Sequence, residues 1–182
     1  MKIKLLTQPF AILIGILFSL PAGFNAAPAP EPNIGVNGYF SVDRAQRGRI
    51  TQAAIVIDIP SGFHVNSNRP LEKYLIATQL KIEAPNGIRV GPITYPRASL
   101  RTFKFSKNRL SVYEGRAILR FNVTVPANYQ GNEAVLKARV RFQSCNDEVC
   151  FPPKNQEIDM GIGVGGANDR VQRTNGWVFG GR

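Results

Sequence analysis

The amino-acid sequence predicts an all-β protein built as an antiparallel β-sandwich. Stretches of alternating apolar and polar residues recur about every 8 to 12 residues, a spacing typical of the short strands of a sandwich. The 17 glycines and 13 prolines supply turns between these stretches. No stretch shows a convincing helical period. With 182 residues, the chain is long enough for one domain with a hydrophobic core.

The first 27 residues are predicted to form a secretory signal peptide. They begin with the basic residues Lys2 and Lys4 and continue into an apolar run, residues 10–20, that is too short to span a bilayer. Small residues, including Ala26 and Ala27, follow where cleavage would occur. An uncleaved membrane anchor is the alternative. We expect a periplasmic or secreted protein with no stable membrane insertion after the signal is removed.

Three further segments are expected after the signal peptide. Residues 28–34 form a Pro-rich leader that should be stiff and unpacked. The β-sandwich domain is expected to span residues 35–160. Residues 161–182 are rich in glycine and are predicted to be a flexible tail. Trp177 and Phe179 are the only aromatic residues of this tail, and we expect disorder there rather than docking onto the domain.

The individual strands are predicted from the two-residue period of their side chains and from the turn residues that bound them. The clearest, residues 116–125, places Ala117, Leu119 and Phe121 on one face and is followed by a proline. A second alternating stretch, residues 133–145, leads to the first cysteine. In chain order, the predicted strands are residues 39–42, 49–59, 63–66, 78–82, 88–95, 110–113, 116–125, 133–145 and 156–160.

The chain is basic, which raises the question of an acidic partner. Its formal net charge is +11, and cleavage that removes Lys2 and Lys4 lowers this by 2 to +9. A basic protein can bind nucleic acid, but export argues against that class of partner. The densest basic stretch, residues 97–109, carries no known nucleic-acid motif. A solvated basic face is therefore favoured over a dedicated electrostatic site, and no nucleic-acid partner is expected.

Few residues of the chain suit metal or hydrolytic chemistry. One histidine and two cysteines cannot complete a four-ligand zinc site without carboxylates. A copper ion held by His64 and the cysteines is a minor alternative, and a packed or surface histidine is favoured. A cysteine–histidine catalytic pair requires contact between the two and an orienting group, which nothing local indicates. We expect neither a metal nor a cofactor.

Thiol–disulfide chemistry is what remains, and it rests on Cys145 and Cys150. The pair follows the strand that ends near residue 145, with turn residues between the cysteines and two prolines after them. An exported chain meets an oxidising compartment, so a disulfide between them is the simplest expectation. So short a loop stabilises by only about 2 kcal/mol in the loop-closure model. From the spacing alone, a static structural disulfide and a redox-active one remain equally open.

The neighbours of the cysteines suggest how a redox-active pair would behave. Redox cysteines are commonly found as Cys-x-x-Cys at a helix start, which lowers the thiol pKa, whereas no helix follows this pair. Asp147 and Glu148 bring negative charge that disfavours a thiolate. We therefore expect slow reaction with small thiols and a need for the activated thiolate of a partner. Such a module would have no small-molecule substrate. It would be a thiol–disulfide oxidoreductase only if the cysteine pair is redox-active.

The cysteine segment and several upstream motifs together resemble a known family. The motifs are Phe142-Gln-Ser-Cys145, Val149-Cys150, Phe151-Pro-Pro153, Gly62-Phe-His-Val-Asn66, Ile93-Thr-Tyr-Pro96 and Leu110-Ser-Val-Tyr-Glu-Gly115. Over roughly residues 35–160 the chain is similar to the amino-terminal domain of the thiol:disulfide interchange protein DsbD. The segment that contains the cysteines and the double proline is the most specific part. The spacing of the cysteines is one residue shorter than in the best-known member.

The resemblance implies an immunoglobulin-like sandwich in the bacterial periplasm. In that family the cysteine pair takes electrons from a thioredoxin-like module and passes them to periplasmic thiol–disulfide proteins. Thioredoxin-like redox proteins are thus the expected donor and acceptor. By position, Cys150 matches the cysteine that forms mixed disulfides and Cys145 the resolving cysteine. The sequence as given ends at Arg182, without the family's membrane and thioredoxin-like domains, so a separate protein is the expected donor.

The family also has a cap loop, in which an aromatic residue covers the disulfide. Phe105 is the best match and Phe103 the second, and Phe151 next to Cys150 completes the expected partner-binding set. An ordinary core role for the cap-loop phenylalanines stays open. The alternative function is an exported protein-interaction sandwich with a purely structural disulfide. The sequence does not predict an oligomeric state.

Overall fold

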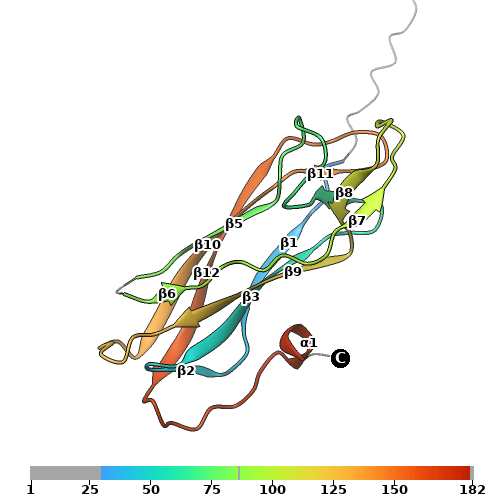
Figure 1. Cartoon of the computed structure of the whole chain (residues 1–182). Helices are drawn as coiled ribbons and strands as arrows, with labels where there is room; N and C mark the ends of the chain where they lie inside the picture. The colour runs from blue at the N-terminus through green and yellow to red at the C-terminus, as the bar shows by residue number, and fades with distance from the viewer. Residues whose placement is uncertain (1–29, 86, 181–182) are drawn as a thin grey trace, which may run out of the picture. The chain divides into compact units, whose positions relative to one another are not determined.

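Two four-stranded sheets form the sandwich, and a smaller four-stranded sheet lies at one end of it (Figure 1). The computed structural model describes residues 30–85 and 87–180, so the predicted signal peptide and residues 28 and 29 of the predicted leader lie outside the described residues. The prediction that the leader is unpacked was wrong at its end, because Ile34 is 3% exposed and belongs to the core. The first sheet has the order β1 (Gly35–Phe40), β3 (Ile50–Asp58), β9 (Arg116–Thr124) and β6 (Arg89–Val90). The second has the order β2 (Arg44–Gln46), β12 (Lys154–Gly165), β10 (Glu133–Phe142) and β5 (Gln79–Glu83).

The strand pairing confirms the predicted antiparallel sandwich. Neighbouring strands run antiparallel in every described pairing except β12 with β2, which is parallel. The two longest pairings are β3 with β9, from Ile50 opposite Thr124 to Asp58 opposite Arg116, and β10 with β12. Extended backbone pairing of this kind satisfies the main-chain donors and acceptors of the buried strands.

The core lies between the two large sheets and follows the two-residue period of the sequence. In β10 the alternate residues Ala134, Leu136, Ala138, Val140 and Phe142 are buried, and the residues between them are exposed. The alternate residues of β9, from Ala117 to Val123, are buried in the same way. Because successive side chains of a strand point to opposite faces, each strand contributes one apolar face to this core.

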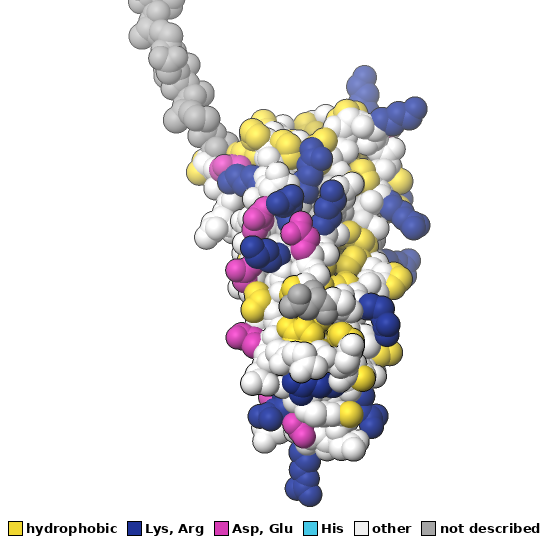
Figure 2. Space-filling view, turned by 90° about the vertical axis from the view of Figure 1, so that its left-hand side faces the viewer, with side chains coloured by type: hydrophobic (Ala, Val, Ile, Leu, Met, Phe, Trp, Pro, Cys, Tyr) yellow, Lys and Arg dark blue, Asp and Glu magenta, His cyan; other side chains and the backbone are white. Residues whose placement is uncertain are grey.

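The opposite faces of β5, β10 and β12 carry charges of both signs. A shallow groove there is lined by Lys81, Glu83, Lys137, Arg139, Glu157 and Asp159, among others. The Nε atom of Arg139 lies 2.6 Å from Oε1 of Glu157, an exposed ion pair. Figure 2 shows positive and negative side chains intermixed on the side of the domain that faces left in Figure 1. The positive charge of the chain is therefore balanced by carboxylates over much of this face.

The segment predicted to be a flexible tail is instead part of the fold as far as residue 180. Strand β12 runs to Gly165, past the boundary predicted at residue 160, because Ile162 and Val164 continue the buried face between the glycines. A short helix, α1 (Gly176–Phe179), then lies against the outer face of the first sheet. The prediction of disorder was wrong here because it weighed glycine content above the apolar alternation.

Helix α1 covers a patch of the sheet that would otherwise be exposed. Val178 is fully buried against Ala54 and Val56 of β3, and the ring of Trp177 meets that of Tyr39 edge to face at 5.1 Å. Nη2 of Arg120 donates a hydrogen bond of 2.6 Å to the carbonyl oxygen of Val178. This cover explains why β3 is buried on both faces from Ala53 to Ile57.

The small sheet brings together the segments that carry the cysteines. Its order is β11 (Ser144–Cys145), β4 (His64–Asn66), β8 (Leu110–Tyr113) and β7 (Ser99–Arg101). Leu110 and Val112 of β8 form a second buried apolar cluster with Leu75 and Phe103, and Phe105 packs against it. Among the described residues, α1 is the single helix, and at 4 residues it is far below the length that crosses a bilayer.

Candidate functional site

Cys145 and Cys150 are joined by a disulfide, with an S–S distance of 2.03 Å. They lie directly opposite each other in a short hairpin. The N–H of Asn146 donates to the carbonyl of Val149 at 2.9 Å, and the N–H of Phe151 donates to the carbonyl of Ser144 at 2.8 Å. Cys145 is fully buried on β11, whereas Cys150 is half-buried. An incoming thiolate therefore has better access to Cys150 than to Cys145.

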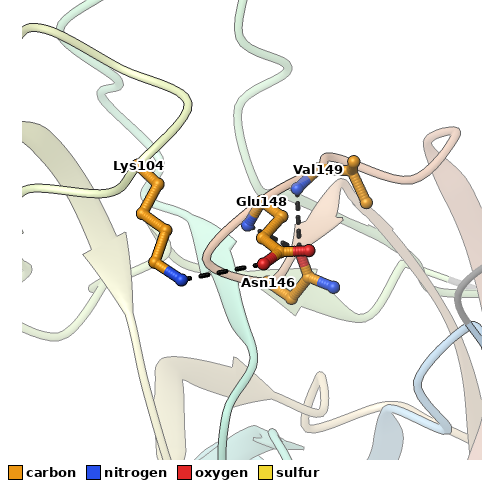
Figure 3. Close-up of polar contacts among 4 residues, drawn as sticks. All are labelled: Lys104, Asn146, Glu148 and Val149. Carbon is orange, nitrogen blue, oxygen red and sulfur yellow. Dashed lines mark hydrogen bonds and ion pairs between the residues drawn. The ribbon is translucent and has the colours of Figure 1, made fainter.

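The turn between the cysteines is held by the side chain of Asn146 (Figure 3). Its Oδ1 atom accepts hydrogen bonds from the N–H groups of Glu148 and Val149, each at 2.8 Å. An asparagine that bonds the backbone two and three residues on is a common device for closing a tight turn. Because these bonds do not involve sulfur, we expect the hairpin to keep the two cysteines opposite each other after the disulfide is reduced.

His64 lies next to the disulfide, on the strand that pairs with β11. In the register of β4 and β11 it is directly opposite Cys145, so the two side chains share one face of the small sheet. The residue is only 2% exposed, and the ring of Phe103 is stacked on the imidazole with centroids 3.9 Å apart. Its Nε2 atom makes no hydrogen bond to any described residue. Burial lowers the pKa of His64 to about 4, although the charges of Glu114 and Asp147 act in the opposite direction.

The loop between β7 and β8, residues 102–109, supplies the two phenylalanines expected in a cap. The rings of His64, Phe103 and Phe105 are nearly parallel, with Phe103 and Phe105 centroids 5.7 Å apart and His64 and Phe105 centroids 6.3 Å apart. Phe103 is buried and Phe105 is half-buried. Phe103 is thus the ring in direct contact with His64, although the family resemblance gave Phe105 as the better match to the cap residue.

Polar contacts join this loop to its neighbours at the surface. Nζ of Lys104 lies 3.7 Å from Oε1 of Glu148 in the cysteine hairpin (Figure 3). Nδ2 of Asn108 donates a hydrogen bond of 2.7 Å to Oε1 of Glu72. Both side chains of the ion pair are more than 70% exposed, and such pairs contribute about 0 to 1 kcal/mol. The stacked aromatic rings, and not the ion pair, therefore hold the loop in place.

Phe151, the third residue of the expected partner-binding set, is in contact with the core. It is 8% exposed, and its ring centroid lies 6.1 Å from that of Phe63. Its neighbour Val149 is 46% exposed and is the apolar side chain of the hairpin that faces solvent. No group of three or more His, Cys, Asp or Glu side chains in residues 30–85 and 87–180 has an arrangement that could hold a metal ion.

Comparison with known proteins identifies the family. Residues 37–161 match the family model described as "Thiol:disulfide interchange protein DsbD, N-terminal". The chain belongs to this family. The match covers more than half of the chain and includes both cysteines, the β4 segment and the loop with Phe103 and Phe105. Together with the Cys145–Cys150 disulfide, membership in the DsbD amino-terminal family makes the domain an immunoglobulin-like module for thiol–disulfide exchange.

A search of solved structures also found similar chains. One is the amino-terminal domain of DsbD from Neisseria meningitidis in the reduced form, with 19% sequence identity, a TM-score of 0.41, and coverage of 68% of this chain and 87% of that chain. Another is a family 123 glycoside hydrolase from Clostridium perfringens, with 13% identity, a TM-score of 0.34, and coverage of 73% of this chain and 27% of that chain. A search of curated proteins found no match.

Lowering the pH is expected to destabilise the protein through His64. Its pKa is about 4 in the folded state and about 6.5 when unfolded, so the unfolded chain binds more protons between these values and stability falls with acidification. For this shift, the loss between about pH 7 and about pH 4.5 is about 2 kcal/mol. This loss of stability can be measured by urea unfolding of the wild-type protein and of His64→Phe at both pH values. The variant should lose about 2 kcal/mol less than the wild type; equal losses would show that His64 is not buried in the neutral form.

Proposed function

We propose that this domain is a periplasmic relay that carries reducing equivalents through Cys145 and Cys150 from a thioredoxin-like donor to partner proteins. The observation that carries the proposal is the unequal access to the two cysteines. Cys150 is half-buried at the end of the sandwich, Cys145 is fully buried behind it, and a loop with stacked aromatic rings lies beside them. A module that exchanges disulfides needs one sulfur within reach of a partner and a second one within reach of the first.

The proposed exchange moves two electrons in two steps. A donor thiolate attacks Sγ of Cys150, the Cys145–Cys150 bond breaks, and Cys145 leaves as a thiolate that then takes up a proton. The second thiol of the donor loses its proton and attacks the donor's own sulfur in the mixed disulfide, which releases Cys150. The donor is now oxidised to a disulfide and the domain is reduced to two thiols. The same steps in reverse reduce a disulfide of an acceptor protein.

Partner contact is proposed to involve Phe103, Phe105 and Phe151 around Cys150. Two of these rings lie in the loop of residues 102–109, which is joined to the hairpin by one exposed ion pair. Movement of that loop would expose apolar surface next to Val149, which already faces solvent. We propose that this apolar surface contacts the region around the accessible cysteine of a thioredoxin-like partner. The full burial of Cys145 also supports the second candidate, an exported interaction module with a structural disulfide.

The reduction potential of the Cys145–Cys150 pair tests the proposal. We expect a value of about −180 to −270 mV, the range of proteins that exchange disulfides, rather than the values below about −300 mV of structural disulfides. The purified chain would be equilibrated in glutathione or dithiothreitol buffers of known potential, and the free thiols would then be alkylated and counted. The double variant Cys145→Ser, Cys150→Ser provides the blank. A value below about −300 mV would identify a structural disulfide and reject the relay.

A further inference from the structure

We propose that His64 is the proton acceptor for the thiol of Cys145 when Cys145 resolves a mixed disulfide on Cys150. This inference rests on the proposed function and assigns a residue to its second step. Neither the thiol chemistry of the family nor the sequence pattern requires a histidine here. The structure places the single histidine of the chain beside the sulfur that needs a base.

The geometry brings the three side chains into one row across adjacent strands. His64 is directly opposite Cys145 in the pairing of β4 with β11, and Cys145 is directly opposite Cys150 in the hairpin. Residues directly opposite in an antiparallel pair have Cβ atoms about 5 Å apart and share a face of the sheet. The imidazole of His64 is thus within side-chain reach of Sγ of Cys145, on the side away from Cys150.

A buried imidazole without a partner requires an explanation. Most buried polar side-chain atoms in folded proteins form hydrogen bonds, and leaving one unpaired is destabilising. In the part of the chain that the structure describes, two buried side-chain polar atoms lack a partner, Nε2 of His64 and Oδ1 of Asn66. Both belong to β4, two residues apart and so on the same face. A ring nitrogen kept free beside a disulfide is available when that disulfide opens and a thiol forms.

Burial keeps the imidazole of His64 neutral, so it can act as a base, although the surrounding charges act in the opposite direction. Burial under Phe103 keeps His64 uncharged at neutral pH, so that one ring nitrogen has a free lone pair. The nearby carboxylates of Glu114 and Asp147 act to raise its pKa and would stabilise the imidazolium that forms. Glu114 is itself paired with Arg101 at 2.7 Å, and Glu148 of the hairpin with Lys104 at 3.7 Å. These carboxylates are partly or largely exposed, which leaves His64 as the buried base next to Cys145.

The step can be written with its protons and electrons in balance. After Cys150 has formed a mixed disulfide with a partner, Cys145 is a thiol. His64 accepts the proton of this thiol as Sγ of Cys145 attacks Sγ of Cys150. The Cys145–Cys150 bond forms, the bond from Cys150 to the partner breaks, and the partner leaves as a thiolate. The proton then passes from His64 to the leaving thiolate or to water. Over both steps of the exchange, the dithiol of the domain is oxidised by two electrons and the partner disulfide is reduced by two.

A small aromatic disulfide, 5,5′-dithiobis(2-nitrobenzoate), separates this step from the first. The reduced protein should release one thionitrobenzoate as Cys150 attacks the reagent, and a second as Cys145 displaces it from Cys150. We expect His64→Phe and His64→Gln to leave the first release within about twofold and to slow the second by about 10- to 100-fold near pH 7. This is at or below the lower end of general-base contributions, because an imidazole with a lowered pKa is a weak base. Cys145→Ser should show the first release alone, which assigns the phases.

The pH dependence distinguishes proton transfer from a packing role. In both variants the rate of the second release should rise about tenfold per pH unit towards the ordinary thiol pKa of about 8.5, whereas in the wild type it should be nearly flat around neutral pH. Equal second-phase rates and equal profiles in wild type and variants would overturn the assignment of His64. A wild-type potential in the range of structural disulfides, with the His64 effect intact, would reject the relay and leave the proton-transfer role standing.

Discussion

Replacing Cys145 by serine is expected to trap a disulfide between Cys150 and a redox partner. In the wild-type protein a mixed disulfide on Cys150 is short-lived, because the buried Cys145 lies directly opposite and displaces the partner. Serine removes the resolving sulfur, and Cys150 remains half-buried and within reach of other proteins. Incubation of the reduced variant with an oxidised periplasmic extract should give adducts on a non-reducing gel that disappear on addition of dithiothreitol. Mass spectrometry should identify thioredoxin-like proteins among them.

Cys150→Ser is the matched control for this experiment. It also leaves one cysteine, but the remaining Cys145 is fully buried, so we expect at least about tenfold less adduct, because exchange depends on access to the sulfur. If the two variants trap partners equally, the assignment of Cys150 as the attacking cysteine is wrong. If neither variant traps a partner, the result favours a structural disulfide and counts against the relay.

The fold was largely predictable because its long strands have a strict two-residue period. The predicted strands at residues 116–125 and 133–145 correspond closely to β9, and to β10 with β11. The predicted strand at residues 88–95 is shorter in the structure, where β6 covers two residues and Thr94 forms an isolated bridge to Arg120. Strands β2 and β7 were not predicted, because three residues are too few to show a two-residue period; β4 is equally short but was indicated by the turn residues on either side of it.

The candidate site was predictable only where it is local in sequence. The cysteines, the turn at Asn146 and the cap-loop phenylalanines can all be found from neighbouring residues or from a family pattern. The position of His64 beside Cys145 depends on the register of two short strands about 80 residues apart in the chain, which no local pattern encodes. The Gly62–Asn66 motif was part of the family resemblance, but it did not indicate that this segment lies beside the cysteines or which side chain faces them.

The basic stretch shows that a count of charges does not reveal how the charges are paired in the fold. Residues 97–109 carry the densest positive charge in the sequence, yet Arg101 is paired with Glu114 and Lys104 with Glu148. Both carboxylates lie outside the stretch, one at the end of β8 and one in the cysteine hairpin. Part of the positive charge is therefore paired with carboxylates from other segments, which the charge count alone could not show.

Replacing Phe103 by alanine is expected to open the disulfide to small thiols. The ring is 9% exposed, is stacked on His64 at 3.9 Å, and packs in the cluster with Leu75, Leu110 and Val112. Removing a buried phenylalanine costs about 3 to 5 kcal/mol when the site cannot collapse, so the loop should detach far more often. We expect reduction of the Cys145–Cys150 bond by dithiothreitol to be at least about tenfold faster than in the wild type, because access limits this exchange.

Lys104→Met provides the matched control, because it removes the exposed ion pair of the same loop and keeps a long side chain. Such a pair contributes about 0 to 1 kcal/mol, so its loss should change the reduction rate no more than about fivefold. The pKa of His64, followed by NMR, offers a second readout. It should rise from about 4 towards its ordinary value in Phe103→Ala, because water then reaches the imidazole, and stay unchanged in Lys104→Met. A raised pKa of His64 with an unchanged reduction rate would show that Phe103 shields the histidine and not the sulfurs. Phe105 would then be the candidate for the residue that covers the disulfide.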